Sequence, residues 1–259
     1  MPFYLSSFVL WSAMTCCAIR PSLPSPAADA SCGAPVECAN SAPAALTYSP
    51  GQEVPDHVWQ QLGAAAFFSV SELPDSIFRI MQGKSYKANC GIPRTDLRYV
   101  RCLHRTAEGK AVVGELVVNK RIAQTVADIF LQLFENGYPI ERMRLVDYWD
   151  AEDERSMRAN NTSAFNFRYI SHTRKISKHG LGLAIDINPL YNPYYKKLPG
   201  GKSVCEPSTA TRYLDRSRRF PYKIIPGDLC HRLFTQHGFR WGGSWKNSKD
   251  YQHFEWAGN

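Results

Sequence analysis

The chain of 259 residues is 44% hydrophobic and 12% aromatic, which is enough apolar material to build a sizeable core. Its 21% of charged residues excludes a chain that is mostly disordered. The formal net charge of +8 suits an anionic partner such as nucleic acid, a lipid surface or another polymer. No Lys/Arg-rich helix or stacking-aromatic motif accompanies this charge, so we expect no nucleic acid partner.

Residues 1–19 resemble a signal peptide, because an apolar run from Phe3 to Ala18 precedes a polar stretch. The run is too short for a comfortable membrane span, so we expect no stable span. No Lys or Arg precedes it, which is atypical of a signal peptide. We expect export to the periplasm or cell envelope. Two alternatives stay open: lipid attachment at Cys16 or Cys17, and a segment without targeting value.

Cysteine usage also favours export. Six of the eight cysteines follow residue 19: Cys32, Cys38, Cys90, Cys102, Cys205 and Cys230. None forms a CxxC pair or lies near a histidine at zinc-finger spacing, so disulfide formation in an oxidising compartment is the simplest interpretation. Proximity along the chain suggests the pairs Cys90–Cys102 and Cys205–Cys230, although sequence alone does not fix the connectivity.

The domain organisation follows from composition and periodicity. Residues 20–56 are rich in Pro, Ala and Ser and are predicted to be a linker. Residues 57–93 are predicted to be a helical extension, with one short helix over 57–70 and a second over 71–83. The compact domain is expected over 94–259.

Strands and helices are mixed in the compact domain. Apolar residues with a period of 3.6 predict a helix between Asn119 and Gly137 and another over 228–236. Residues 151–159 are predicted to be a charged loop. Strands are predicted over 97–106, 109–119, 142–149, 165–170, 183–190, 239–245 and 250–256. This order favours an α+β fold with one small, mostly antiparallel sheet flanked by helices.

The stretch SKHGLGLAIDINPL places a carboxylate, Asp186, inside an apolar strand. A buried carboxylate is costly unless an arginine, a set of backbone donors or a metal ion compensates it. Zinc accepts His and Asp ligands, and glycines between His179 and Asp186 would let the chain bend so that both side chains converge. The best-placed third ligand is His253, because alternation in YQHFEW turns it away from its apolar neighbours.

These motifs, together with WGGSW and NTSAFNFR, resemble the zinc peptidases of bacterial cell-wall metabolism. That group contains D-Ala-D-Ala carboxypeptidases and dipeptidases and L-Ala-D-Glu endopeptidases, and it shares a fold with lysostaphin-type peptidases and the hedgehog signalling domain. The SxHxxGxAxD pattern is matched from Ser177 to Asp186, and the resemblance covers about 94–256. It implies one zinc per chain, bound by His179, Asp186 and His253.

The resemblance also implies catalytic roles. The family's carboxylate three residues before the last histidine falls on Asp250, which would act as general base and as proton donor to the leaving amine. Arg168 matches an arginine that polarises the scissile carbonyl or binds a substrate carboxylate; a surface salt bridge is the alternative. Ser177 would contact the site or the substrate. Glu255 shares a strand face with His253, so it either orients that ligand or competes with Asp250 as the base.

Three tryptophans, Trp241, Trp245 and Trp256, could line the cleft or belong to the core. The predicted function is a zinc-dependent peptidase acting on peptidoglycan stem peptides, monomeric, of carboxypeptidase or endopeptidase type. A non-catalytic, hedgehog-like zinc-fold binding module of the cell wall and a protein with a structural metal are the alternatives. Asp250 and Arg168 favour catalysis, and three rather than four ligands leave the open position that a catalytic zinc requires.

Overall fold

A long antiparallel hairpin organises the computed structural model, in which residues 44–170 and 173–258 are described. Its strands are β3 (Leu97–Arg105) and β4 (Ala111–Asn119), as the sequence predicts. The short strands β2 (Ser69–Glu72) and β1 (Glu53–Val54) extend it to a sheet of order β1-β4-β3-β2. Nearly every side chain of β4 is buried, because its Val and Leu residues are covered on both faces of the sheet.

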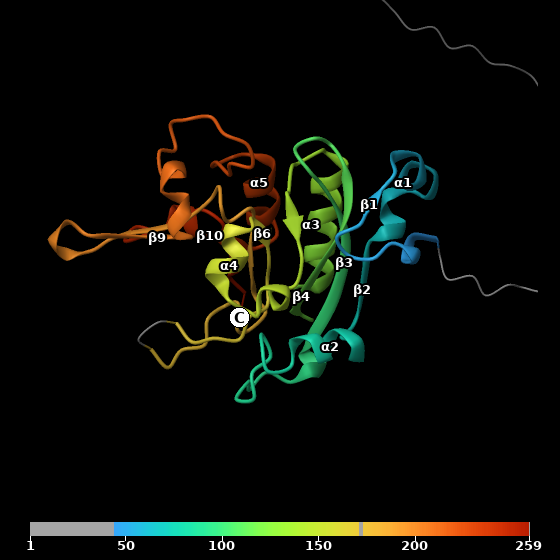
Figure 1. The fold of residues 1–259 in the computed structure, drawn as a ribbon, viewed down its shortest axis with the longest axis horizontal. Coiled ribbons are helices and arrows are strands. Elements are labelled where there is room, and N and C mark those ends of the chain that lie inside the picture. The colour runs from blue at the N-terminus through green and yellow to red at the C-terminus, as the bar shows by residue number, and fades with distance from the viewer. Residues whose placement is uncertain (1–43, 171–172, 259) are drawn as a thin grey trace, which may run out of the picture. The chain divides into compact units, whose positions relative to one another are not determined.

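Helix α3 (Ala123–Glu135) packs on this sheet and contributes one face to the main hydrophobic core. Its buried stripe includes Val126, Ile129, Phe130 and Leu133, which follow the helical period predicted from the sequence. Figure 1 shows α3 between the hairpin and the C-terminal helix α5 (Leu229–Gln236). The Phe130 and Phe234 rings join the two helices edge to face at 6.2 Å.

Three smaller sheets complete the fold, and two of them build the site described below. The first sheet contains, in spatial order, β10 (Phe239–Trp241), β12 (His253–Trp256) and β7 (Ala184–Asp186). The second contains β11 (Lys249–Asp250), β8 (Tyr194–Lys197) and β9 (Ser203–Glu206). The third pairs β5 (Arg142–Met143) with β6 (Asn161–Thr162). All named strand pairs are antiparallel except β5–β6, so the predicted α+β class is confirmed.

Several local predictions are wrong. The strand expected over 142–149 is limited to β5, because Val146–Trp149 form a 3-10 helix. The helix expected over 57–70 is shorter, because α1 (Asp56–Leu62) ends at Gly63, whose φ is 79°. The charged loop at 151–159 contains α4 (Asp153–Arg158), which has acidic residues in its first turn and basic residues in its last, an arrangement that suits the helix dipole. No strand forms over 165–170, because Phe165 and Phe167 hydrogen-bond to separate parts of the chain.

The N-terminal extension contains α1, α2 (Asp75–Met81) and β2. Because β1 and β2 are hydrogen-bonded to the central hairpin, the described chain from residue 44 onward lies in one compact unit. The domain boundaries drawn from the sequence stay predictions. The signal-like segment 1–19, the linker up to residue 43, and Cys16, Cys17, Cys32 and Cys38 lie outside the described residues. Among the described helices, none has the length and apolar character that a membrane span needs.

The four described cysteines are free thiols, so the predicted pairs Cys90–Cys102 and Cys205–Cys230 are wrong. Cys102 and Cys230 are wholly buried in the core, the former with its Sγ 3.1 Å from the Sδ of Met143. Cys90 and Cys205 are only half-buried. Closeness in sequence was a poor guide, because each predicted pair combines a core side chain with one near the surface.

Candidate metal centre

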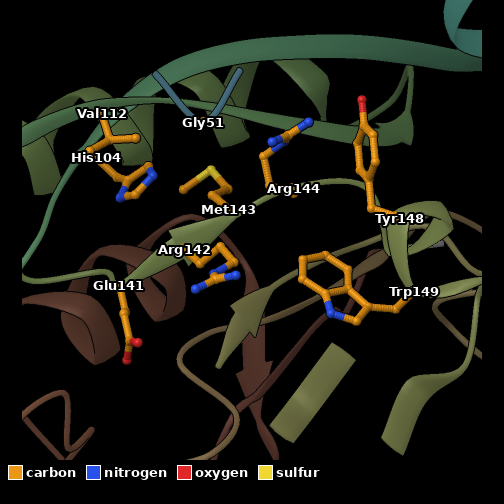
Figure 2. A pocket seen from close by; sticks show the side chains of 9 residues that line it. All are labelled: Gly51, His104, Val112, Glu141, Arg142, Met143, Arg144, Tyr148 and Trp149. Carbon is orange, nitrogen blue, oxygen red and sulfur yellow. The ribbon is translucent and has the colours of Figure 1, made fainter. Parts of the chain in front are cut away.

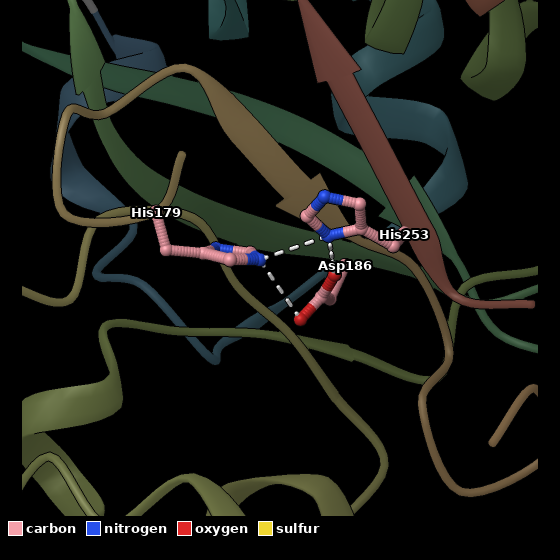
Figure 3. Close-up of side chains that lie close together, drawn as sticks. All are labelled: His179, Asp186 and His253. Atoms are coloured by element: carbon pink, nitrogen blue, oxygen red, sulfur yellow. Dashed lines mark hydrogen bonds and ion pairs between the residues drawn. The ribbon is translucent and has the colours of Figure 1, made fainter. Parts of the chain in front are cut away.

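Strand pairing brings two of the predicted ligands together. In the β7–β12 ladder His253 lies directly opposite Asp186, and its Nδ1 is 2.9 Å from Asp186 Oδ1. His179 reaches the same point from the preceding turn, with its Nε2 3.2 Å from Asp186 Oδ2 and 3.1 Å from His253 Nδ1. Figure 3 shows the three side chains converging, and their ligand atoms all lie within 4.8 Å of one another.

The turn before β7 positions His179. The backbone N–H of Gly180 donates to Ser177 Oγ at 3.0 Å, so this serine holds the turn from inside. Gly182 has a φ of 67°, which favours glycine, and its carbonyl accepts a hydrogen bond from Asn119 N at 2.8 Å. A Cβ at Gly182 would lie 2.7 Å from Asn119 N, so only glycine fits between the His179 turn and the end of β4.

We therefore expect Gly182→Ala to destabilise the protein by about 2–3 kcal/mol and to weaken zinc binding, because the turn carrying His179 must shift. Denaturant unfolding and a zinc competition titration would measure both effects. Gly83→Ala is the matched control, because Gly83 has a φ of 75° with open space around it, and it should cost only about 1 kcal/mol. Equal losses in the two variants would contradict the close approach at Gly182.

Contacts outside the triad orient both imidazoles: a hydrogen bond for His179 and an ion pair for His253. His179 Nδ1 lies 2.7 Å from the carbonyl oxygen of Ala164, which can only accept, so Nδ1 carries the proton and Nε2 presents its lone pair to the site. His253 Nε2 lies 3.6 Å from Glu255 Oε2, which leaves Nδ1 as the ligand atom. Both histidines are buried, so these orientations are held by packing as well.

The electrostatics of the triad favour a cation. Burial alone would raise the pKa of Asp186, but the neighbouring His179 and His253 hold it well below its usual range. Burial likewise lowers the pKa of His253, whereas hydrogen bonds to Asp186 and Glu255 outweigh it and raise the pKa to about 10. Zinc binding displaces the proton from His253, and two imidazoles with one carboxylate at this spacing are then donors that Zn²⁺ accepts, so the residues fit the implied metal.

Glu255 forms an ion pair with His253 and does not itself belong to the triad. We expect Glu255→Gln to weaken zinc binding by about 10- to 100-fold, because the His253 tautomer and ring orientation lose their charged partner. A competition titration against a chelator would measure the zinc affinity. Glu72→Gln, at an exposed position on β2, should leave the affinity unchanged. An unaltered affinity in Glu255→Gln would remove Glu255 from the support of the site.

Asp250 lies beside the triad on β11. The chain is tightly packed there, because a Cβ at Gly242 would lie 2.7 Å from the Cβ of Asp250 and 3.3 Å from that of His253. The Oδ1 atom of Asp250 is buried and has no hydrogen-bond partner among the described residues. Burial raises the pKa of Asp250 to about 7, helped by Asp186 and Glu206 and opposed by His253. A buried carboxylate with a free oxygen and this pKa suits proton transfer near neutral pH.

The guanidinium of Arg168 uses only part of its hydrogen-bonding capacity within the described residues. Its Nε forms an ion pair with Asp153 Oδ2 at 2.9 Å, while its Nη1 is buried without a hydrogen-bond partner among the described residues. Its backbone carbonyl accepts a hydrogen bond from Ser177 N, which connects it to the His179 turn. The salt bridge that the sequence analysis gave as the alternative role of Arg168 is thus present, and its Nη1 donor stays unpaired among the described residues.

The predicted substrate-contacting residues lie in different environments. Trp245 is half-buried, and its ring centroid is 5.5 Å from that of His253, so it lies at the site. Trp256 packs beneath Arg121, whose Cζ is 4.5 Å from the ring centroid. Trp241 is buried in the core. The Ser177 hydroxyl is engaged within its own turn. Substrate contact by Ser177, Trp245 and Trp256 stays a prediction.

The segment that contains the triad is similar to a known peptidase family. Residues 171–256 match the M15 peptidase family model described as D-alanyl-D-alanine carboxypeptidase. The resemblance inferred from sequence motifs is thereby confirmed, over about a third of the chain. The M15 segment contains the metal triad and Asp250, whereas Arg168 precedes it. No curated protein and no solved structure matches the chain. The M15 match supports a metallopeptidase hydrolase.

A separate pocket of about 460 Å³ lies on the side of the fold that carries β5. Figure 2 shows its lining side chains, which come from β5, the following turn and the central hairpin. The lining residues are Gly51, His104, Val112, Glu141, Arg142, Met143, Arg144, Tyr148 and Trp149. Neither the M15 triad nor Asp250 lines it, so it plays no part in the chemistry proposed below.

Proposed function

We propose that the protein is a zinc-dependent peptidase that hydrolyses peptide bonds in peptidoglycan stem peptides, as a D-Ala-D-Ala carboxypeptidase or an L-Ala-D-Glu endopeptidase. The observation that carries the proposal is the convergence of His179, Asp186 and His253 beside the unpartnered carboxylate oxygen of Asp250. The proposal includes one zinc per chain, a monomer, and export to the cell envelope. The net charge of +8 suits an anionic wall.

In this proposal the chain binds the metal through His179 Nε2, His253 Nδ1 and the Asp186 carboxylate. When bound, zinc would lower the pKa of a water molecule and polarise the scissile carbonyl. Asp250 Oδ1 takes the proton from the attacking water and passes it to the leaving amine. Arg168 Nη1 donates a hydrogen bond to the carbonyl oxygen as negative charge develops there. Trp245 forms one wall of the site.

The decisive experiment is digestion of defined muropeptides by the zinc-loaded protein, followed by mass spectrometry of the products. Loss of one terminal D-alanine would identify a carboxypeptidase, and cleavage after L-alanine would identify an endopeptidase. A catalytically inactive protein that still binds muropeptides would favour the alternative, a hedgehog-like binding module. The free oxygen of Asp250 and the free donor of Arg168 favour the enzyme, because binding alone needs neither.

A further inference from the structure

The pocket of about 460 Å³ beside β5 contains no residue of the metal centre, and its volume is typical of a small-molecule site. Val112 and Met143 contribute apolar surface to its lining, and Tyr148 and Trp149 contribute aromatic rings (Figure 2). Small-molecule sites combine such surfaces with a few fixed polar groups that orient the ligand. The polar groups of this lining therefore indicate which chemistry the pocket would accept.

The two arginines of the lining differ in their partners. Arg144 Nε forms an ion pair with the buried Glu115 at 2.8 Å, and its Cζ lies 4.1 Å from the centroid of the Tyr148 ring. Arg142 forms no ion pair and no side-chain hydrogen bond within the described chain, and its Cζ is 6.0 Å from the centroid of the Trp149 ring. A free guanidinium beside an aromatic face suits a ligand that carries a carboxylate and a flat ring.

A buried imidazole supplies a hydrogen-bond acceptor to the same lining. His104 on β3 is 3% exposed, and its Nδ1 lies 2.7 Å from the carbonyl oxygen of Ile140, so Nδ1 carries the proton. Burial lowers the pKa of His104 to about 4, opposed by the Ile140 hydrogen bond and helped by Arg142, so the ring is neutral at pH 7. Its Nε2 lone pair has no partner among the described residues. An unpaired buried acceptor at a pocket indicates a ligand that donates a hydrogen bond.

The one carboxylate of the lining limits the charge that a ligand can carry. Glu141 Oε2 accepts a hydrogen bond from Asn160 Nδ2 at 2.8 Å, and no described side chain forms an ion pair with Glu141. This carboxylate would repel a dianion such as phosphate. A monoanion with several hydroxyl groups fits better, because its charge would pair with Arg142 and its hydroxyls would donate to Glu141 and His104.

An exposed arginine without a counter-ion is ordinary, because water solvates it. This pocket differs in that the unpaired Arg142 shares one lining with the indole of Trp149 and the buried acceptor of His104. An anion alone would use only the first of these three groups, and a neutral sugar only the other two. A ring that bears both a carboxylate and hydroxyl groups would use all three.

We propose that the pocket beside β5 binds an acidic sugar, with its carboxylate on Arg142, one face of its ring against Trp149 and a hydroxyl donated to His104. The proposed binding is independent of the metal, because no residue of the triad lines the pocket. Two sources share this chemistry: a free sugar acid and an acidic sugar unit within a polysaccharide.

The test is a titration of the full, zinc-loaded, ¹⁵N-labelled chain with galacturonate, followed through the indole N–H signals of its six tryptophans. Trp149→Phe identifies the Trp149 signal by its absence. We expect galacturonate to shift this signal saturably with a Kd of about 1 mM. Galactose, which lacks the carboxylate, should bind about 10- to 100-fold more weakly. Equal binding of the two sugars, or no saturable shift of the Trp149 signal, would overturn the proposal.

Further ligands separate a sugar from a simpler anion. Benzoate carries a carboxylate and a flat ring without hydroxyls, and inorganic phosphate carries charge without a ring. Each should bind at least about tenfold more weakly than galacturonate, and equal binding of either would overturn the proposal. Trigalacturonate distinguishes the two sources. An affinity higher by about tenfold indicates a unit of a polysaccharide, whereas an equal or lower affinity indicates a free sugar acid.

Arg142→Gln removes the charge that selects the acid. In this variant the preference for galacturonate over galactose should fall to about one, and its survival would contradict the role of Arg142. Arg79→Gln is the matched control, because Arg79 is exposed on α2 and does not line the pocket. It should keep the wild-type preference. Zinc content and thermal unfolding of both variants should match the wild type, which confirms that the fold is intact.

Removal of the zinc separates this site from the proposed peptidase. The chelator-treated wild type should bind galacturonate with an unchanged Kd, and loss of binding would contradict a site that is independent of the metal. Arg142→Gln should retain wild-type zinc-dependent hydrolysis of muropeptides. A protein that binds galacturonate at Trp149 but cleaves no muropeptide would retain the sugar site and refute the peptidase, and the opposite result would do the reverse.

Discussion

Asp250→Asn should retain one zinc per chain while kcat for muropeptide hydrolysis falls by roughly 10²- to 10⁴-fold. The amide preserves the shape of the side chain, and its Oδ1 position still lies beside the triad, but it no longer accepts a proton at neutral pH. Metal analysis and product mass spectrometry would measure the two quantities. Unchanged turnover would contradict the assignment and transfer the role of base to Glu255.

The same substitution has a stability signature that an exposed aspartate of ordinary pKa would not show. Burial raises the pKa of Asp250 in the folded protein to about 7, whereas an unfolded aspartate has a pKa of about 3.9. The folded state therefore binds more protons between these values, so the stability of the zinc-free wild type falls as pH rises from about 4 to about 7. Asp250→Asn lacks this decrease, and its stability relative to the wild type should be greatest above pH 7. Denaturant unfolding across this range checks the sign.

His179→Ala should lose zinc, from about one per chain to almost none, and with it all hydrolysis. Two ligands would remain, and among the described residues no fourth His, Cys, Asp or Glu belongs to the group that could hold the ion. At free zinc about 1,000 times above its Kd, the wild type should gain about 4 kcal/mol of stability, and the variant should gain almost none. Metal analysis and unfolding with and without a chelator would measure these effects.

His57→Ala is the matched control, because His57 is exposed on α1 and takes no part in the triad. It should bind zinc and respond to a chelator as the wild type does. Full zinc occupancy in His179→Ala would remove His179 from the site, and loss of zinc in His57→Ala would show that metal analysis is reporting general instability.

The triad could be predicted because its signals are local. His179 and Asp186 lie in one short motif, and alternation in YQHFEW turns His253 toward the site. The central hairpin and α3 could be predicted for a similar reason, since long strands and a long apolar stripe carry many consistent residues. Short elements such as β6 and α4 carry too few residues for periodicity to decide between strand, helix and loop.

Other features of the site could not be predicted, because they depend on backbone groups and strand register and not on the type of side chain. The Ala164 carbonyl orients His179, and any residue would supply it, so no pattern marks the position. The pairing of β8 with β9 and β11 places Glu206 in one row with Asp250, and the sequence did not predict β8 or β9. The cysteine pairing failed because disulfides depend on where side chains point, and a neighbour along the chain can lie on the other side of a sheet.

The contact between Gly182 and Asn119 bears on how this chain can be divided. The segment matched by the M15 model, residues 171–256, contains the three predicted ligands, but Asn119 at the end of β4 and the Ala164 carbonyl, which contact it, both precede it. Excised alone, it would lose the surface against which the turn that carries His179 packs. The smallest transplantable unit therefore begins no later than Leu97, where the hairpin starts, and a chimaera joined at residue 171 should fail to assemble the site.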